Sequence, residues 1–233
     1  MDSLKDGYRA VVAGATGGIG AAFVQLLQSD ARCGEVIGLS RSSSPAIDFT
    51  DENTLAAAAE IVGRNHGVID LLIDATGWLH DEEYRPEKSL ASVNAEQLAR
   101  SFVNNASGPI LLLKHFSRLF PDDDRCIFAT LSARVGSIGD NALGGWYGYR
   151  ASKAALNMLV RTAAIELRRT RPNNVCLALH PGTVETGLSA PFTRNRNLFT
   201  PESSAKKMLS VIDTVGPENS GTFLAYDGSE IEW

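Results

Sequence analysis

The feature that most constrains this chain is an apolar run that leads directly into a glycine-rich loop. Tyr8–Ala13 predicts a strand, the loop Gly14-Ala15-Thr16-Gly17-Gly18-Ile19-Gly20 predicts a sharp turn, and Ala21–Leu27 predicts a helix. A strand, a glycine-rich turn and a helix in this order are typical of the first unit of a dinucleotide-binding fold. The glycines allow the backbone to approach a pyrophosphate, which the free N–H groups at the start of a helix attract.

The spacing of these glycines is compatible with two patterns. Gly14, Gly18 and Gly20 match G-x-x-x-G-x-G, whereas Gly14, Gly17 and Gly20 match G-x-x-G-x-x-G. The two spacings belong to different branches of related enzymes. A turn with a purely structural role is the alternative, although the predicted strand and helix on either side favour nucleotide binding.

Predicted strands and helices alternate along the rest of the chain. Apolar runs predict six more strands, at Val36–Ser40, Ala46–Phe49, Ile69–Ile73, Cys126–Leu131, Val175–Leu179 and Thr222–Tyr226. Helical patterns occupy Asp51–Gly63, Ala95–Phe120 with a kink at Gly108-Pro109, a run from near Trp146 to Leu167, and a segment that begins at Thr200-Pro201-Glu202. This alternation predicts an α/β fold of the Rossmann type, a doubly wound, seven-stranded and mostly parallel sheet with helices on both faces.

The length of 233 residues suits a single domain, 1–233, that covers both faces of a sheet. The stretch 186–199 has weak periodicity and contains Arg194 and Arg196, so we interpret it as a short substrate lid. Trp78–Leu90 is polar and irregular, which predicts a surface loop beside the site.

Composition and charge limit the classes of partner that the chain is expected to bind. An apolar fraction of 44% and a charged fraction of 21% are ordinary for a globular protein, and a net charge of −5 argues against nucleic acid or an anionic membrane surface. No apolar stretch approaches the length of a membrane span, and the first residues lack the apolar core of a signal peptide. The three cysteines form no Cys-x-x-Cys pair and the four histidines have no metal-ligand spacing, so we expect a cytoplasmic protein with reduced thiols and no metal.

A tyrosine and a lysine one helical turn apart are the clearest catalytic candidates. Tyr149 and Lys153 stand at i and i+4 of a helix that continues through the uninterrupted run Ala151–Leu167, so both project from one face. A phenol has a reference pKa of about 10, and a neighbouring ammonium favours the phenolate and lowers that pKa. We therefore expect Tyr149 to act as a general acid or base assisted by Lys153, although this spacing alone is weak evidence.

The end of the predicted strand Val36–Ser40 bears on the choice of nucleotide. An acidic residue at this position would bind the 2′-hydroxyl of the adenosine ribose, but the chain has Ser40 and Arg41 there. A guanidinium can pair with a 2′-phosphate, which favours NADP(H) over NAD(H), and a solvated loop charge is the alternative. Asp48, at the end of the next predicted strand, either meets the adenine ring or caps the helix that follows.

Polar residues and a glycine follow two central strands, and two asparagines lie inside the predicted helix Ala95–Phe120. Asp74-Ala75-Thr76-Gly77 follows Ile69–Ile73, and its glycine lets the backbone lie close to a bound cofactor. Ser132 follows Cys126–Leu131 directly. Asn104 and Asn105 stand in a mostly apolar surround, where buried amides need hydrogen-bond partners.

In order and spacing these features resemble the short-chain dehydrogenase/reductase family across essentially the whole chain. The matching pieces are the Gly14–Gly20 loop, Asp74–Gly77, Ser132, the pair Tyr149 and Lys153, and Pro181-Gly182. The stretches Ser132–Ile138 and Gly144–Tyr147, with the ending Gly221–Trp233, are most similar to the C-factor-like subgroup. Within this resemblance the G-x-x-x-G-x-G spacing of the loop is preferred.

The resemblance implies interconversion of a carbonyl and an alcohol by hydride transfer with a nicotinamide cofactor. It implies that Tyr149 exchanges a proton with the substrate oxygen, that Lys153 lowers the tyrosine pKa and binds the nicotinamide ribose, and that Ser132 polarises the carbonyl. For Asn105 it implies a bound water that links the lysine to solvent. Cofactor contacts are expected from Gly14, Thr16, Gly17, Gly18, Ile19, Gly20, Ser40, Arg41, Asp48, Ala75, Thr76, Gly77, Tyr149, Lys153, Pro181, Gly182 and Val184.

Three departures from the family pattern qualify these expectations. Asp74–Gly77 replaces Asn-Asn-Ala-Gly, which changes the hydrogen bonds that support the central strands. Ala13 replaces a threonine before the first loop glycine, which removes a hydroxyl but leaves the backbone cradle. The gap from Ser132 to Tyr149 is longer than in most relatives, which implies either a wider substrate pocket or competition by Ser137 for the serine role. We favour Ser132 because it follows the strand directly.

Two functions follow from this sequence. The first is an NADP(H)-dependent reductase of a small-molecule carbonyl compound, favoured by the complete set of Ser132, Tyr149, Lys153 and Asn105. The alternative is an NADP(H)-binding regulatory or cell–cell signalling protein with little or no turnover, because the C-factor-like subgroup is linked to cell–cell signalling. Apolar residues in Phe223–Trp233, at an edge expected to be exposed, predict a homodimer or homotetramer.

Overall fold

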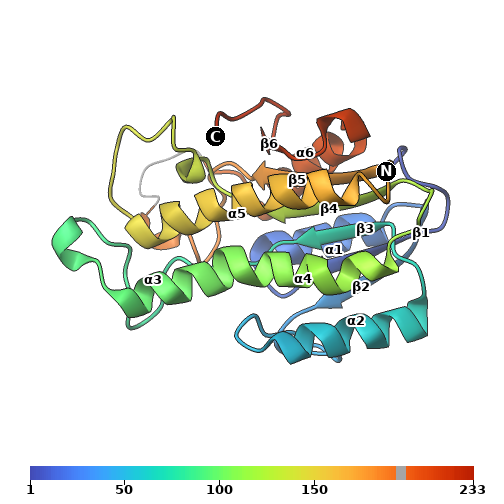
Figure 1. Ribbon diagram of the computed structural model, residues 1–233, viewed down its shortest axis with the longest axis horizontal. Coiled ribbons are helices and arrows are strands. Elements are labelled where there is room, and N and C mark those ends of the chain that lie inside the picture. The colour runs from blue at the N-terminus through green and yellow to red at the C-terminus, as the bar shows by residue number, and fades with distance from the viewer. Residues whose placement is uncertain (193–197) are drawn as a thin grey trace.

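Six parallel strands form one sheet in the part of the chain that the structure describes. This computed structural model describes residues 1–192 and 198–233, and its strands are β1 (Tyr8–Ala13), β2 (Cys33–Leu39), β3 (Leu71–Asp74), β4 (Cys126–Leu131), β5 (Asn174–His180) and β6 (Thr222–Ala225). Their order in the sheet is β2-β1-β3-β4-β5-β6, and every neighbouring pair is parallel (Figure 1). The strand order switches direction between β1 and β3, and in such sheets the ligand crevice lies outside the carboxyl ends at this point.

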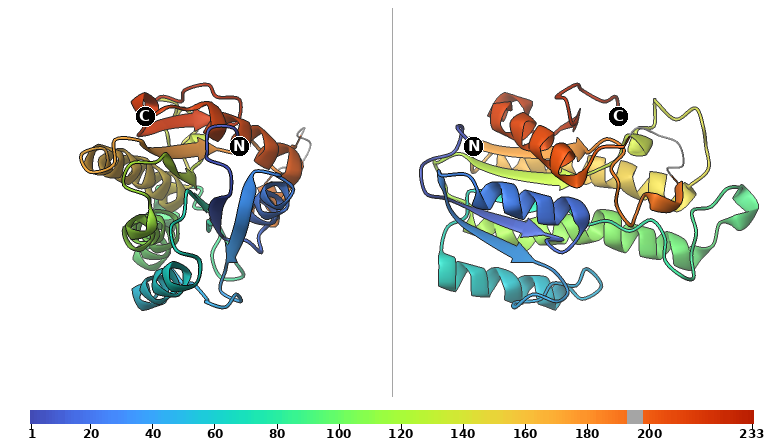
Figure 2. Two further views of the ribbon diagram at one scale, coloured as in Figure 1. Left: turned by 90° about the vertical axis from the view of Figure 1, so that its right-hand side faces the viewer. Right: turned by 180° about the vertical axis from the view of Figure 1, so that it is seen from behind.

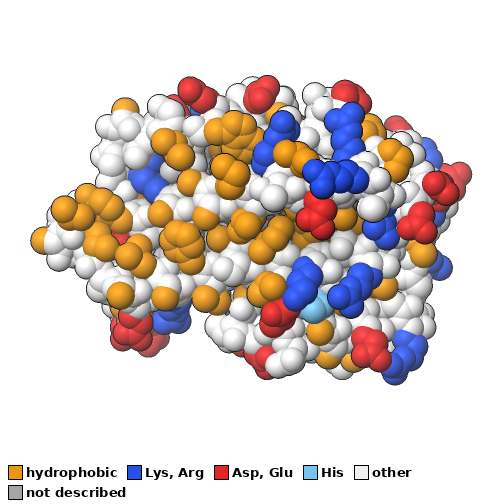
Figure 3. Space-filling view, viewed as in Figure 1, with side chains coloured by type: hydrophobic (Ala, Val, Ile, Leu, Met, Phe, Trp, Pro, Cys, Tyr) orange, Lys and Arg blue, Asp and Glu red, His pale blue; other side chains and the backbone are white. Residues whose placement is uncertain are grey.

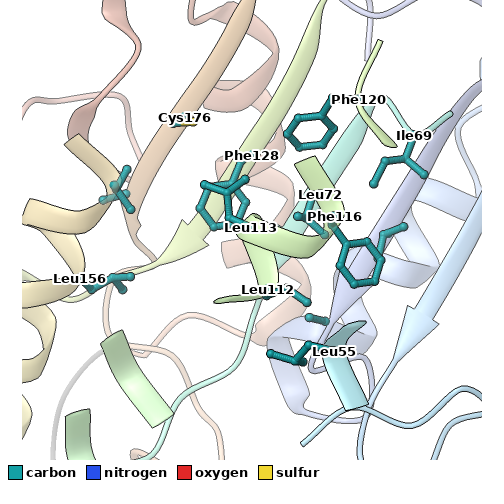
Figure 4. Packing of buried hydrophobic residues seen from close by; sticks show 14 of the residues in the cluster. Leu55, Ile69, Leu72, Leu112, Leu113, Phe116, Phe120, Phe128, Leu156 and Cys176 are labelled. Atoms are coloured by element: carbon teal, nitrogen blue, oxygen red, sulfur yellow. The ribbon is translucent and has the colours of Figure 1, made fainter. Parts of the chain in front are cut away.

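Helices cover both faces of the sheet, as the left-hand view of Figure 2 shows. One face carries α1 (Gly18–Gln28) and α6 (Pro201–Thr214), and the other carries α2 (Glu52–His66), α4 (Gly108–Phe116) and α5 (Tyr147–Leu167). Side chains alternate along the strands, so that Val12 packs against the first group of helices and Val11 against the second. Figure 4 shows the larger core, on the side of α2, α4 and α5. The predicted doubly wound α/β fold is confirmed.

The predicted strand Ala46–Phe49 is wrong, so the sheet has six strands and not seven within the described residues. The N–H of Ile47 donates to the carbonyl of Ser40 at 3.0 Å, and the N–H of Asp48 donates to Thr54 Oγ1 at 2.8 Å. These backbone N–H groups are hydrogen-bonded within the turn that leads into α2, so they do not form β-sheet hydrogen bonds with β2.

The predicted helix Ala95–Phe120 is divided by a π-helical turn. α3 (Ala95–Phe102) is followed by the π-helical residues Val103–Ser107 and then by α4, and a 3₁₀ turn at Ser117–Leu119 ends the run. The kink predicted at Gly108-Pro109 is therefore replaced by a π-helical turn just before these residues. Pro109 itself lies in the first turn of α4, where proline is tolerated because its missing N–H would have no partner inside the helix. A Cβ on Gly108 would overlap the ring of Phe49, so the glycine allows this ring to pack on the helix.

Most apolar side chains of the C-terminal segment belong to the core, which corrects the prediction of an exposed apolar edge. Phe223 and Ile231 are buried, and the N–H of Ile231 donates to the carbonyl of Phe223, so the chain end folds back along β6. Trp233 stacks on Phe223 with 6.0 Å between ring centroids. Exposed hydrophobic side chains gather over the face of α3, α4 and α5 (Figure 3), and they include Phe102 and Met158. A homodimer or homotetramer stays a prediction.

A helix that crosses a lipid bilayer needs about 20 predominantly apolar residues. In residues 1–192 and 198–233, no helix is both long enough and apolar enough to do so.

Candidate functional site

The glycine-rich loop forms a tight turn between β1 and α1. Gly14 has a φ of +79°, and a Cβ there would lie 2.9 Å from the carbonyl oxygen of Ala75, so only glycine fits without strain. A Cβ on Gly20 would overlap the carbonyl oxygen of Gly14. The loop is therefore held against both β3 and its own first residue, with glycine required at the two ends.

The start of α1 has backbone donors without a partner inside the helix. The first bond of the helix runs from the N–H of Ala21 to the carbonyl of Gly17 at 2.8 Å, so the N–H groups of Gly18, Ile19 and Gly20 have no partner inside the helix. Gly17 stands at the N-cap and has no side chain to satisfy them. Together with the helix dipole, these donors make a site suited to a phosphate group.

A cleft of about 830 Å³ opens beside this loop, at the carboxyl ends of β1, β2 and β3. It brings together nine of the predicted cofactor residues, namely Gly14, Thr16, Gly17, Ser40, Arg41, Asp48, Ala75, Thr76 and Gly77. Its wall also contains residues that sequence reasoning did not assign to the cofactor site, and they come from the segment before α2, from α3, from the π-helical turn and from α4. They are Ile47, Phe49, Thr50, Glu96, Ala99, Arg100, Val103, Asn104, Ser107 and Leu111. Trp78 lines the same cleft, in agreement with its predicted place beside the site.

Asp48 does not cap α2, which settles one of the two alternatives left by the sequence. The N-cap is Asp51, whose carboxylate accepts the N–H of Asn53 at 3.0 Å. Asp48 instead accepts both the N–H and the hydroxyl of Thr50, and these bonds, with the charge of Arg41, lower the pKa of Asp48. Arg41 is exposed at the mouth of the cleft, so its side chain is available to a ligand.

The lining of this cleft does not include the other eight predicted cofactor residues, namely Gly18, Ile19, Gly20, Tyr149, Lys153, Pro181, Gly182 and Val184. The last three belong to the segment after β5. Gly182 has a φ of +78°, and a Cβ there would lie 2.8 Å from the Phe199 ring. The same segment reaches the start of α1, because a Cβ on Gly18 would lie 3.2 Å from Thr186 Cγ2. The residues after β5 therefore border the free N–H groups of α1 from the other side.

Tyr149 and Lys153 are neighbours on α5, but the structure contradicts the expected direction of the tyrosine pKa. The ammonium of Lys153 lies 5.9 Å from the centroid of the Tyr149 ring and donates to the carbonyl of Leu131 at 2.7 Å. Burial raises the pKa of Tyr149 to about 12 and lowers the pKa of Lys153 to about 8. Desolvation is stronger here than the effect of the cation, because the lysine charge is directed at β4 and not at the phenol oxygen.

Asp74 shows how the departure from Asn-Asn-Ala-Gly is accommodated. This fully buried carboxyl group accepts the hydroxyls of Thr130 on β4 and of Thr76, each at 2.6 Å. Burial raises the pKa of Asp74, whereas the two hydroxyls and the positive charge of Lys153 oppose that rise. Asp74 thus links β3 to β4 beneath the lysine.

Asn105 holds the segment after β3 through its side-chain amide, and the bound water that the family resemblance implies for it stays a prediction. Its amide oxygen accepts the N–H of Trp78 at 2.7 Å, and its amide nitrogen donates to the carbonyl of Trp78 at 2.8 Å and to Ser152 Oγ at 3.2 Å. This fully buried side chain belongs to the π-helical turn. Asn105 therefore fixes the backbone of Trp78 and connects it to α5.

Ser132 is better placed than Ser137 to act with α5. The Ser132 hydroxyl donates to Oδ1 of Asn157, a residue of α5, at 2.6 Å. The Ser137 hydroxyl accepts the N–H of Asp140 inside its own loop. Sequence reasoning missed Asn157, although its position four residues after Lys153 places it on the same helical face.

The start of α5 is held by a buried carboxylate from the loop between β3 and α3. Both oxygens of Glu87 accept the N–H of Gly148, at 3.2 and 3.3 Å, and the backbone carbonyl of Glu87 accepts the N–H of Trp146. Glu87 is 3% exposed, and Trp146 is in the left-handed conformation with φ of +53°. A negative side chain at a helix N-terminus also interacts favourably with the helix dipole.

Removal of this cap is expected to destabilise the protein. Glu87→Ala leaves the buried N–H of Gly148 without a partner, which costs about 1–3 kcal/mol in the free energy of unfolding. Glu87→Gln keeps an acceptor and is expected to lose less. Denaturant unfolding checks this, with Glu82→Ala, an exposed glutamate in the same loop, as the control. Equal midpoints for Glu87→Ala and Glu82→Ala would contradict the assignment.

The predicted lid is only partly within the described residues, because 193–197, including Arg194 and Arg196, lie outside them. In the described part, Phe192 packs edge-to-face on Trp146 and on His80, with centroid distances of 5.2 and 5.3 Å. Trp146 packs edge-to-face on Tyr149 at 6.2 Å. A row of aromatic rings therefore extends from the lid to the candidate catalytic tyrosine.

Comparison with known proteins identifies the family. The sequence profile described as Enoyl-(Acyl carrier protein) reductase matches residues 12–231. The chain belongs to the short-chain dehydrogenase/reductase family. Short-chain dehydrogenases/reductases are oxidoreductases, so family membership confirms the resemblance drawn from the sequence.

Individual proteins place the chain within the short-chain dehydrogenase/reductase family. C-signal of Myxococcus xanthus is 36% identical over 172 residues, which are 72% of this chain and 94% of that protein. The 1-hydroxy-2-glutathionyl-2-methyl-3-butene dehydrogenase of Rhodococcus sp. (strain AD45) is 30% identical over 191 residues, 81% of this chain and 79% of that protein. The structure of NADPH-bound carbonyl reductase from chicken fatty liver is similar with a TM-score of 0.86 and 25% identity, over 99% of this chain and 95% of that one. The similarity to C-signal confirms the C-factor-like subgroup.

Proposed function

We propose that this protein is an NADPH-dependent reductase of small-molecule carbonyl compounds, with Tyr149 as the proton donor. The observation that carries the proposal is the meeting of three groups at the carboxyl end of β4. Ser132 follows that strand, Lys153 binds its last carbonyl, and Tyr149 stands one turn before the lysine on α5. The cleft of the glycine-rich loop opens along the same edge of the sheet.

The lining of the cleft fits NADPH. The free N–H groups at the start of α1 suit the pyrophosphate, and the exposed guanidinium of Arg41 suits the 2′-phosphate. Gly77, in the lining of the cleft, lies next to the catalytic candidates, because a Cβ there would lie 3.8 Å from Asn105 Oδ1 and 4.0 Å from Lys153 Nζ. When bound, NADPH supplies the hydride for reduction of the carbonyl carbon.

The side chains of this chain then supply binding and proton transfer. Tyr149 donates its phenol proton to the carbonyl oxygen, and Ser132 holds that oxygen by a hydrogen bond. Burial raises the pKa of Tyr149 to about 12, so the phenol of the free protein keeps its proton at neutral pH, as a donor must. Lys153 lies beside the Tyr149 ring and holds the last carbonyl of β4, and Asn105 fixes the Trp78 backbone at the wall of the cleft.

The aromatic row beside Tyr149 favours an apolar or aromatic carbonyl substrate. His80, Trp146 and Phe192 present ring faces and edges to one another next to the phenol. Phe192 belongs to the proposed lid, 186–199, of the proposed single domain 1–233. Such walls exclude water and orient a flat substrate by shape, which leaves Ser132 and Tyr149 to recognise the oxygen.

The choice of NADPH over NADH is expected to depend on Arg41. Calorimetric titration is expected to give a preference for NADPH of tenfold or more, about 1.4 kcal/mol. Arg41→Ala is expected to remove this preference while the affinity for NADH stays within about threefold of wild type. Arg64→Ala, which removes an exposed arginine on α2, serves as the charge-matched control and keeps the preference.

Two results would contradict this assignment. A preference for NADPH that persists in Arg41→Ala means that another group reads the 2′-phosphate. Failure of both nucleotides to bind leaves the glycine-rich loop as a structural turn and removes the basis of the catalytic assignments.

Similarity to C-signal favours a second candidate function. An NADP(H)-binding regulatory or signalling protein would bind NADPH tightly, reduce no compound in a panel of aldehydes and ketones, and change its affinity for a partner when the nucleotide binds. The tyrosine–lysine pair distinguishes the two functions, because a sensor has no use for a phenol beside an ammonium. A turnover number that depends on Tyr149 therefore supports the reductase.

A further inference from the structure

One buried amide near the proposed active site has no role in the function described so far. Asn157 is 2% exposed and stands on α5 at i+8 from Tyr149 and i+4 from Lys153. Its helical neighbours Leu156 and Val160 are fully buried in the apolar core. An amide in such a position needs a partner for both its oxygen and its nitrogen, because unpaired polar groups in an apolar core are unfavourable.

Only one end of this amide is satisfied within the described residues. Oδ1 of Asn157 accepts the hydroxyl proton of Ser132 at 2.6 Å, whereas Nδ2 has no hydrogen-bond partner there. A serine hydroxyl has one proton to donate and two lone pairs to accept with. In this arrangement the proton of Ser132 is directed at Asn157 and is not available to another acceptor.

This arrangement conflicts with the role proposed for Ser132. A carbonyl oxygen only accepts hydrogen bonds, so Ser132 can hold it only by donating its single proton. Asn157 must then stop accepting that proton. Rotation of the amide by about half a turn exchanges its oxygen and nitrogen without a change of shape, after which Nδ2 donates to Ser132 Oγ.

We propose that Asn157 is a positioning residue that directs the hydroxyl proton of Ser132 by presenting either end of its amide. Without substrate, Oδ1 accepts the proton, as the structure shows. With a carbonyl compound bound, Nδ2 donates to Ser132 Oγ and the serine proton points at the substrate oxygen. The inference rests on the proposed reductase function and adds a residue to its site.

The surroundings of the pair support such a role. Lys153 and Asn157, one turn apart on α5, contact the adjacent positions Leu131 and Ser132 at the end of β4, at 2.7 and 2.6 Å. The backbone of Ser132 is fixed independently, because its N–H donates to the carbonyl of Leu179 at 2.7 Å. With the serine backbone held by β5, the remaining freedom lies in the hydroxyl proton and in the amide that faces it.

The substitution Asn157→Asp tests the proposal with little change of shape. When it is ionised, in assays at alkaline pH, this buried carboxylate accepts but does not donate, so it holds the Ser132 proton permanently. With NADPH and 4-nitrobenzaldehyde as the probe substrate, kcat is expected to fall by about 10²-fold, as when one hydrogen-bond donor to a developing oxyanion is lost. The dissociation constant for NADPH is expected to stay within about threefold of wild type, because Asn157 does not line the cleft.

A double-mutant cycle separates positioning from a general structural effect. In the Ser132→Ala background the proton is absent, so Asn157→Asp and Asn157→Leu are expected to change kcat by no more than about threefold. In the wild-type background Asn157→Asp is expected to match the loss caused by Ser132→Ala, whereas Asn157→Leu, which removes the competing acceptor, is expected to lose less. Thermal unfolding of every variant confirms that each one is folded during the assay.

The outcomes distinguish this inference from the proposed function. Wild-type kcat in Asn157→Asp, or an equal loss of kcat with and without the Ser132 hydroxyl, would overturn the role of Asn157. The reductase function would still stand in that case, provided that Ser132→Ala and Tyr149→Phe lower kcat. If wild-type protein does not reduce the probe, or if Ser132→Ala and Tyr149→Phe keep full turnover, the reductase function fails and the inference fails with it.

Discussion

Replacement of Tyr149 by phenylalanine is expected to lower kcat for carbonyl reduction by about 10²–10⁴-fold, the usual contribution of one well-placed general acid. The substitution removes the phenol oxygen and keeps the ring, so the edge-to-face contact with Trp146 survives. Steady-state kinetics with NADPH and an aromatic aldehyde measure kcat. The dissociation constant for NADPH, measured by calorimetry, is expected to stay within about threefold of wild type.

Tyr147 provides the matched control for this experiment. It stands two residues earlier, at the start of α5, and it is 38% exposed. Tyr147→Phe removes the same atom from the same helix and is expected to keep wild-type kcat. Near-wild-type turnover in Tyr149→Phe would refute the proton-donor role and would favour the signalling alternative, provided that NADPH still binds.

The second large effect is expected from Gly20→Ala, which adds one methyl group to the glycine-rich loop. The new Cβ would overlap the carbonyl oxygen of Gly14 and lie 2.7 Å from its carbonyl carbon. These are backbone atoms and cannot move aside as a side chain does, so the loop must shift, at a cost of about 1–3 kcal/mol in unfolding free energy. The shift also displaces the N–H groups at the start of α1, so NADPH affinity is expected to fall by about 100-fold or more.

Gly17→Ala is the control for the stability part of this prediction. A Cβ on Gly17 would lie 3.4 Å from Gly14 O, which is an ordinary contact, and its φ of −77° suits alanine. Thermal unfolding is expected to separate the variants, with a lower midpoint for Gly20→Ala only. Equal midpoints for both variants would show that the loop tolerates a side chain at Gly20.

The order of strands and helices and the location of the crevice could be predicted from local pattern. β1, the glycine-rich loop and α1 follow from an apolar run, a cluster of glycines and a helical run, each visible within a few residues. The predicted strand at Ala46–Phe49 was wrong because four residues carry too little periodicity to distinguish a strand from an extended turn. In the structure that segment is held by Ser40 and by Thr54, and neither contact is visible in a local pattern.

The chemistry of the site was harder to predict, because it depends on contacts between distant segments. Tyr149 and Lys153 could be paired by helical spacing, but the direction of the tyrosine pKa depends on burial and on the carbonyl of Leu131 that orients the ammonium. Asn105 could be singled out as an amide in an apolar surround, whereas its partner Trp78 lies 27 residues away. Asn157 was missed because an amide in a long helix is normally solvated, and only its contact with Ser132 gives it meaning.

The carboxylate of Glu87 places a limit on how new substrate specificities can arise in this protein. The loop between β3 and α3 contributes His80 to the aromatic row, so it is a natural segment to vary when a different substrate is wanted. The same loop holds the first turn of the helix that carries Tyr149, through the two oxygens of Glu87. A library or a chimaera that exchanges the whole loop therefore alters the catalytic helix together with the pocket. Designs that retain Glu87 and vary the residues around His80 keep the two effects apart.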